Sequence, residues 1–211
     1  MAPTPRAAVL FSGGKDSALA AVLLEPFYEV TLVTCGFGAT DAPAHAREAA
    51  RSLGFDHEVL ALPREVAETA VDRLLADGYP NEAIQSVHEA AVERVAADDR
   101  GLETIVEPYG PDAVADGTRR DDRTPAVSRS FARSVEDRHG VDHLAPLAGF
   151  GRQAVDGLVD RHLRVVTGPS DDLATGDYEA ALRALLCERA GPEAVAAVFP
   201  EHTQSRVLGR R

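Results

Sequence analysis

The sequence predicts an α/β protein with a mostly parallel sheet, and three observations carry that prediction. Short β-branched or aliphatic runs alternate with longer amphipathic stretches, which is the order expected of strands joined by crossover helices. The chain has 211 residues, enough for one domain, or one domain and an appendage, with a sizeable core. Its longest uninterrupted aliphatic stretch has seven residues, 18–24, whereas a membrane-spanning helix needs ~20.

The first half of the chain is predicted to form β–α units. A continuous apolar run starts it, a valine- and threonine-rich run follows, and alanines recur at helical spacing before Gly54, which is placed to end their helix. Two apolar stripes then predict helices with ordinary core faces. In chain order the predicted elements are the strand 7–11, the helix 16–24, the strand 28–35, the helix 42–53, the strand 57–62 and the helices 66–75 and 84–95.

The second half continues the alternation and ends differently. Thr124 and Pro125 offer an N-cap and a first-turn proline for a helix, and residues 101–109 fit either a strand or a helix end. We expect residues 1–170 to form the main domain and residues 171–211 a helical appendage with a basic, mobile tail. The predicted elements are the strand 112–116, the helix 124–137, the strand 141–145, a helix around 155–159, the strand 163–167 and the helix 177–189.

The amino-acid composition and the first residues indicate in which cellular compartment the protein works. The formal net charge is −12, and Lys15 is the only lysine beside 21 arginines. Excess carboxylate suits the salt-rich cytoplasm of a halophilic archaeon, while a GC-rich genome explains the arginine bias equally well. The first residues lack a signal-peptide pattern, so we expect a cytoplasmic protein. Two cysteines make neither a disulfide framework nor a zinc knuckle, and His139 and His143 show no metal-ligand spacing.

The motif Ser-Gly-Gly-Lys-Asp-Ser, residues 12–17, separates the first predicted strand from the first helix. Consecutive glycines let backbone N–H groups turn towards one point, and the following helix adds the positive end of its dipole, so the motif predicts a phosphate-binding loop. A Walker A loop would require glycine in place of Val9 and serine or threonine in place of Asp16. The carboxylate of Asp16 is better suited to a magnesium ion that bridges phosphate oxygens. A glycine-rich turn with an incidental lysine is the alternative.

At these residues the sequence resembles a known family. The motif is similar to the pyrophosphate loop of the PP-loop ATP pyrophosphatases, which include GMP, NAD and asparagine synthetases and the tRNA thiolation and lysidine enzymes. The resemblance is closest to small archaeal proteins described as alpha hydrolases or as predicted subunits of a tRNA thiouridine-forming enzyme. It implies a Rossmann-like (HUP) three-layer α/β sandwich with strand order 3-2-1-4-5, and cleavage of ATP to AMP and pyrophosphate.

A second polar loop follows the predicted fourth strand. In a sheet of that order, ligands bind where the strand order reverses, between strands 1 and 4. The resemblance therefore implies Asp116, Gly117 and Thr118 as nucleotide contacts and Asp121 and Asp122 as further magnesium ligands. A polar loop capped by aspartates is the alternative.

Arginines add positive charge to this part of an acidic chain. Arg129 and Arg133 are four residues apart and share a face of the predicted helix. Together with Arg119 and Arg120 they are candidates to contact departing pyrophosphate or an anionic acceptor, or else they pair with surrounding carboxylates.

The end of the second strand is the expected adenine site by analogy with the family. Gly36 would permit close approach, and Phe37 would offer a stacking face. Cys35 and Cys187 invite a sulfur-transfer role, but small buried cysteines are the ordinary outcome.

The resulting hypothesis is an adenylating enzyme that uses ATP and magnesium. Lys15 and Asp16 are the catalytic candidates beside Ser12, Gly13, Gly14 and Ser17, and a sulfur or nitrogen nucleophile then displaces AMP. The acceptor would be a tRNA base, recognised directly or through a partner subunit. The alternatives are a small-molecule amide ligase of the NAD or GMP synthetase type, and a module that senses ATP without cleaving it.

Overall fold

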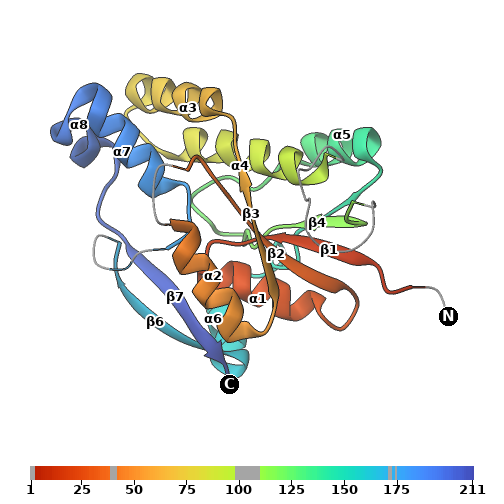
Figure 1. The fold of residues 1–211 in the computed structure, drawn as a ribbon. Coiled ribbons are helices and arrows are strands. Elements are labelled where there is room, and N and C mark those ends of the chain that lie inside the picture. Colours follow the sequence, from red (N-terminus) through yellow and green to blue (C-terminus); the bar gives the residue numbers. More distant parts are fainter. Residues whose placement is uncertain (1–2, 39–41, 98–109, 171–172, 174) are drawn as a thin grey trace.

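Five parallel strands form the central sheet in the order β3-β2-β1-β4-β5, and the first four of them along the chain are labelled in Figure 1. The computed structural model describes residues 3–38, 42–97, 110–170, 173 and 175–211, so the unassigned segment 101–109 lies outside it. The strands are β1 (Arg6–Leu10), β2 (Glu29–Gly36), β3 (Asp56–Ala61), β4 (Ala113–Ala115) and β5 (Asp142–Leu144). This confirms the predicted three-layer α/β fold and its strand order.

Helices cover both faces of the sheet. On one face lie α3 (Arg64–Asp77), α4 (Asn81–Ala96) and α5 (Arg129–His139), followed along the chain by α7 (Glu179–Ala190) and α8 (Pro192–Val198). On the other face lie α1 (Lys15–Leu24), α2 (Ala42–Leu53) and α6 (Arg152–His162).

The central strand explains why both faces must be covered. Side chains alternate along a strand, so Ala8 and Leu10 enter one core while Val9 and Phe11 enter the other. All four are buried, which is typical of a parallel sheet between two helical layers. The glycine-rich motif follows this buried strand and is therefore fixed at the carboxyl edge of the sheet.

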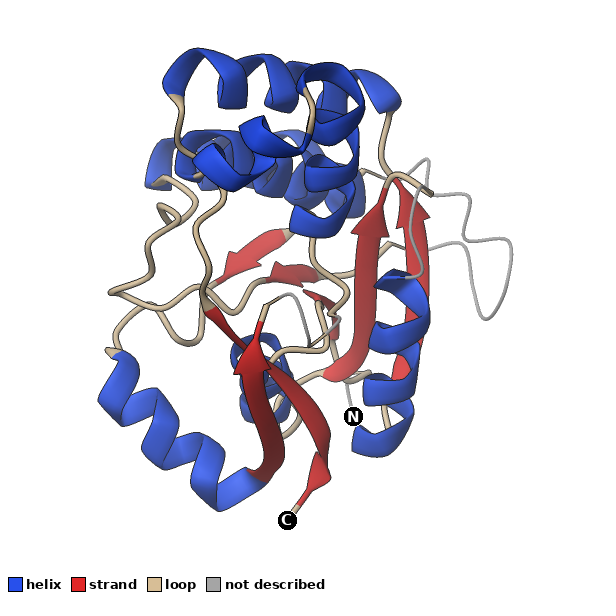
Figure 2. Cartoon of the chain, turned by 90° about the vertical axis from the view of Figure 1, so that its left-hand side faces the viewer, coloured by secondary structure: helices blue, strands red, loops and turns tan. Residues whose placement is uncertain are grey.

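The chain ends in a strand, contrary to the expectation of a mobile tail. β6 (Leu163–Pro169) and β7 (Thr203–Arg210) form a separate antiparallel pair, seen in Figure 2. Val207 is buried in the core beside α1 and α2. Arg210 donates to the Leu53 carbonyl over 2.7 Å, pairs with Glu25 over 2.7 Å and lies over the Phe55 ring.

The terminal strand was missed because its apolar residues are few, and its pairing partner lies 40 residues earlier in the chain. The predicted helical part is present as α7 and α8, while the proposed division at residue 170 stays a prediction. None of the helices in the described parts of the chain is long and apolar enough to cross a bilayer.

Helix α5 begins later than predicted. Its N-cap is Ser128, whose Oγ accepts the N–H of Phe131 over 3.1 Å. Thr124 and Pro125, the predicted start, instead line a cavity beside the sheet. Asn81 donates to the carbonyl of Arg123 over 2.6 Å, which ties this segment to α4 and keeps it out of the helix.

Candidate functional site

The β1–α1 loop, residues 12–17, lies at the carboxyl end of the central strand. Gly13 has φ +79°, a backbone conformation that glycine adopts without steric cost. Helix α1 begins at Lys15, so its first N–H groups, which have no partner within the helix, lie at this loop. A glycine-rich loop at a helix N-terminus favours an anion, and phosphate binding at this loop stays a prediction.

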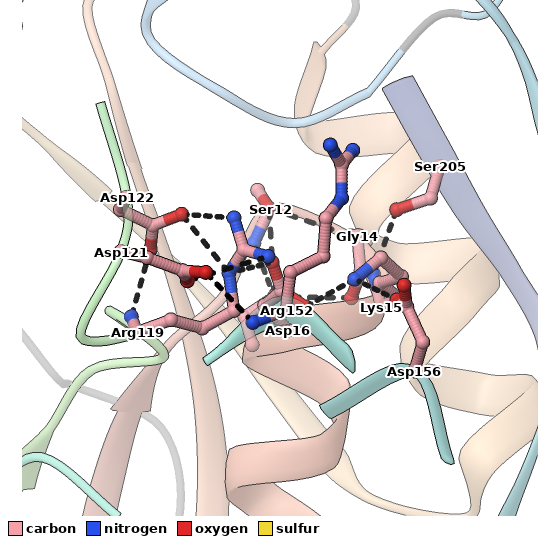
Figure 3. A network of polar contacts seen from close by, with 11 residues as sticks. Ser12, Gly14, Lys15, Asp16, Arg119, Asp121, Asp122, Arg152, Asp156 and Ser205 are labelled. Carbon is pink, nitrogen blue, oxygen red and sulfur yellow. Dashed lines mark hydrogen bonds and ion pairs between the residues drawn. The ribbon is translucent and has the colours of Figure 1, made fainter. Parts of the chain in front are cut away.

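Segments from the far end of the chain hold this loop in place. The N–H of Gly176 donates to the Ser12 carbonyl over 2.6 Å, and the N–H of Val207 donates to the Gly13 carbonyl over 3.0 Å. The Oγ of Ser205 accepts the N–H of Lys15 over 3.1 Å, and this contact is drawn in Figure 3. Strand β7 therefore supplies the cap of α1, so the candidate site depends on both ends of the chain.

The only lysine of the chain is placed beside the site and does not line it. The Nζ of Lys15 lies 2.8 Å from Asp16 and 2.9 Å from Asp156. Asp156 lies on α6 and is half exposed. Lys15 thus joins the start of α1 to α6, and its ammonium group is neutralised by two carboxylates.

Arg119 is the cation at the centre of the site (Figure 3). Its side chain is 12% exposed, and its Nε lies 3.3 Å from Asp16. The guanidinium and the backbone N–H of Arg119 both bind Asp122, while Asp121 lies 4.0 Å away. The Nη1 atom, which is the atom 4.0 Å from Asp121, is buried and makes no hydrogen bond within the described residues.

Gly117 explains how the second polar loop reaches the first. A Cβ at Gly117 would lie 2.7 Å from the backbone nitrogen of Ser17, a separation that atoms do not tolerate. Only glycine lets the loop after β4 pack against the first turn of α1. The nucleotide contacts that the resemblance implies on these two loops are therefore adjacent in space.

Asp116 ends strand β4 and is almost completely buried, with 1% of its side chain exposed. Its Oδ1 accepts the N–H of Thr118 over 2.7 Å, and its Oδ2 lies 3.0 Å from Nε2 of His143. Nε2 of His88 lies 3.7 Å from the same oxygen. Burial raises the pKa of Asp116, but the hydrogen bonds from His143 and Thr118 and the nearby His88 outweigh it and lower the pKa well below its usual range.

A cavity of about 830 Å³ opens over the carboxyl ends of β1 and β2 and over the loop after β4, within the size range of small-molecule sites. Leu10, Val33 and Cys35 give it apolar walls. The polar lining comes from Ser12, Asp16, Ser17, Thr118, Arg119, Asp121, Asp122 and Arg152. The exposed guanidinium of Arg152 points away from the ionic contacts around Arg119 (Figure 3).

The remaining predicted arginines lie elsewhere. Arg129 and Arg133 share a face of α5 as predicted, but they line a second cavity of about 430 Å³ together with Asp116 and His143. Arg120 is exposed and lies against Gly151. The structure therefore does not bring these three arginines to the β1–α1 loop.

The end of β2 contributes a different residue from those predicted. Cys35 lines the large cavity, whereas Gly36 and Phe37 do not. Burial raises the pKa of Cys35 to about 12, although the charge of Arg94 opposes this. The thiol is therefore protonated at neutral pH. Cys187 is exposed and does not line this cavity.

The three carboxylates proposed for magnesium converge on Arg119 rather than on an open ion site. Asp121 accepts the N–H of Arg152 over 2.9 Å, so it caps α6, and this backbone hydrogen bond lowers its pKa. Within the described residues no three His, Cys, Asp or Glu side chains gather to hold a metal. Asp16 and Asp122 fit magnesium only if phosphate oxygens supply most of its ligands, which is the manner of binding that this ion prefers.

Several residues of the site were not predicted. They lie on segments with no recognisable motif: Arg152, Asp156, Ser205, His88, Asp177 and Tyr178. The one usable signal was Gly151 before the helix that carries Arg152 and Asp156, since glycine is accepted at an N-cap.

Comparisons with known proteins extend over almost the whole chain. The model of a family of unknown function, DUF7411, matches residues 6–209. The uncharacterized protein MJ0690 of Methanocaldococcus jannaschii is 40% identical over 202 residues, which are 95% of this chain and 94% of that protein. A crystal structure from Methanocaldococcus jannaschii, described as a predicted subunit of a tRNA methyltransferase, is 37% identical, with a TM-score of 0.83 over 98% of this chain and 97% of that one.

Proposed function

The chain belongs to DUF7411, a family of unknown function, and from its own site we propose that it is an AMP-forming ATP pyrophosphatase of the PP-loop type. One observation carries the proposal. The N-terminus of α1 and the guanidinium of Arg119 meet at a cavity large enough for a nucleotide. Backbone donors and a guanidinium are the groups that bind phosphate.

The phosphates of ATP would lie against the β1–α1 loop. Ser12 and Ser17 offer hydroxyl groups there, and Arg119 and Arg152 offer guanidinium groups. Lys15 holds Asp16 and Asp156, so in this proposal it positions the carboxylate and does not contact phosphate directly. The apolar walls, Leu10 and Val33, suit the base or the acceptor.

The reaction would proceed in two displacements. An acceptor oxygen attacks the α-phosphorus, the bond to the β-phosphate oxygen breaks, and pyrophosphate leaves with its electron pair. Arg119 and the loop amides stabilise the charge that develops on the departing group. Magnesium held by Asp16 and Asp122 would neutralise phosphate charge. A sulfur or nitrogen nucleophile then displaces AMP from the adenylated acceptor.

The acceptor side of the proposal is a tRNA base, reached directly or through a partner subunit. The solved neighbour described as a predicted subunit of a tRNA methyltransferase supports a place in tRNA modification. The net charge of −12 gives little general attraction to RNA, so recognition would depend on local arginines or on a partner.

The test uses the full chain with ATP labelled at the α-phosphate, magnesium and cell extract, and measures labelled AMP. Arg119→Met and Asp16→Asn should each lower AMP formation by at least about 100-fold, with Lys15→Ala less severe. Arg161→Met, an exposed position on α6, is the matched control and should leave the rate unchanged.

Each outcome of this assay has a clear reading. AMP that disappears in the site variants supports the proposal, and dependence on tRNA rather than on a small acid distinguishes it from an amide ligase. ADP as the product, or tight ATP binding without any cleavage, would overturn it, and the latter would indicate an ATP-sensing module.

A further inference from the structure

Two histidines from different elements converge on one buried carboxylate behind the large cavity. His88 comes from α4 and His143 from β5, and both direct Nε2 at the Oδ2 of Asp116. We call these three residues the histidine network. The carboxylate of Asp116 lies at the point where the strand order of the sheet reverses. Its Oδ1 already caps the loop by accepting the N–H of Thr118, so the cap does not require the two imidazoles at Oδ2.

The two histidines differ in what they can reach. The side chain of His143 is 7% exposed and lines the second cavity. The side chain of His88 is 17% exposed and lines the large cavity. Nε2 of His88 is buried without a hydrogen bond in the described part of the chain, so Nδ1 is the nitrogen left for a ligand.

The charge state of Asp116 decides which ring nitrogen of His88 carries the proton. Asp116 is ionised because its hydrogen bonds lower its pKa. An anion facing Nε2 favours the tautomer with the proton on that nitrogen, as carboxylates do for histidines in catalytic and metal sites. Nδ1 then has a free lone pair. A small rotation of the ring would shorten the 3.7 Å separation to a hydrogen bond.

Other titratable groups face His88 from the surrounding elements. The ring of Tyr178, which precedes α7, lies 6.4 Å from that of His88. Burial raises the pKa of Tyr178, and the charge of Asp116 raises it further, so the phenol stays neutral. Cys35 at the end of β2 stays protonated as well. Of these groups, His88 alone has a ring nitrogen that carries no proton in this tautomer and can accept one.

We propose that His88 is the proton acceptor of the second displacement, with Asp116 and His143 as the residues that position it. This rests on the proposed function. When the nitrogen or sulfur nucleophile forms its bond to the adenylated acceptor, the bond to AMP breaks and AMP leaves with the electron pair. The proton of the nucleophile moves to Nδ1 of His88, and Asp116 stabilises the resulting imidazolium while remaining ionised.

Turnover of the full-length protein gives the first test. His88→Gln should lower AMP formation by at least about 100-fold and change the dissociation constant of ATP by less than about 3-fold, because the phosphates bind elsewhere. His162→Gln, an exposed control, should match the wild type.

A second measurement uses the wild-type protein, so it does not depend on whether a His88 variant folds. In ¹⁵N-labelled wild type, ring correlation spectra should show His88 with its proton on Nε2, and added AMP should shift the His88 signals but not those of His162. Asp116→Asn should remove the tautomer preference.

The two proposals fail in different ways. An active wild type with an equally active His88→Gln, or a proton found on Nδ1, overturns the role of His88 and leaves the pyrophosphatase intact. A wild type that binds ATP and forms no AMP overturns both.

Discussion

Two polar networks lie next to the large cavity, and they differ in their exposure to solvent and in the number of their charged groups. The ionic network of Lys15, Asp16, Arg119, Asp122 and Asp156 is partly exposed and has several cations and anions. The histidine network has a single carboxylate that is 1% exposed.

The difference concerns what happens when one partner is lost. In the ionic network a carboxylate that loses one cation keeps another or is hydrated by solvent. Exposed ion pairs contribute little to stability. In the histidine network the described residues give neither imidazole a second carboxylate partner, and unpaired buried groups are costly. The ionic network is therefore free to exchange a partner for a phosphate, while the histidine network must stay intact to hold its geometry.

The largest predicted effect comes from replacing one aspartate by asparagine in each network. Asp116→Asn should lower the free energy of unfolding by about 3 kcal/mol or more, because it removes the charge that holds two buried imidazoles. Asp156→Asn should cost no more than about 1 kcal/mol, since Asp156 is half exposed. Urea unfolding of both variants checks this, and equal losses would contradict the comparison.

Acid sensitivity tests the same carboxylate without removing it. The folded-state pKa of Asp116 lies below its ordinary value of 3.8, so the unfolded chain binds the proton more readily. The stabilisation is therefore present above pH 3.8 and is lost as the pH falls through the folded-state value. Thermal unfolding measured as the pH is lowered below 3.8 should show a steeper loss in the wild type than in Asp116→Asn.

Gly117→Ala should give an intermediate effect, because its Cβ would meet the backbone of Ser17. Forcing the two loops apart should cost about 1–3 kcal/mol and weaken ATP binding. Gly157→Ala is the control: this glycine is exposed on α6 with nothing near its Cβ, and alanine should stabilise the helix by about 0.5–1 kcal/mol. Calorimetric melting and ATP titration measure both, and an unaltered affinity in Gly117→Ala would argue against the packing of the loops.

The smallest effect concerns the cap from the C-terminal strand. Ser205→Ala removes the acceptor for the N–H of Lys15 and should cost about 1 kcal/mol, as losing a helix cap does. Ser134→Ala on the exposed face of α5 should be neutral or slightly stabilising. If hydrogen exchange at the start of α1 is equally fast in both variants, β7 does not cap the helix.

The sequence predicted much of the fold because the signals are local. The apolar run before Ser12, the glycines that follow it and the alternation of strands and helices each depend on neighbouring residues. Strands β1 to β5 and helices α1 to α4 accordingly lie within a few residues of their predicted positions. The start of α5 was wrong because Thr124 and Ser128 are both adequate caps, and tertiary contacts such as that of Asn81 with Arg123 separate them.

The candidate site was predictable only where its residues are contiguous. The pairing of Arg119 with Asp122 spans three positions. By contrast, Ser205 caps Lys15 across 190 positions, and β7 carries too few apolar residues to indicate a strand. His88 and His143 were uninformative because each is isolated in the sequence and acquires meaning only beside Asp116.

The sequence by itself determined the layered α/β fold and the place of a glycine-rich loop after its first strand, because burial patterns and glycine turns are properties of short segments. The tertiary structure decided that Lys15 faces Asp156, that Arg119 takes the centre of the site, and that a buried aspartate lies between two histidines. Those arrangements depend on which distant segments share the carboxyl edge of the sheet. The energetic cost of leaving a charge buried and unpaired then fixes its partners.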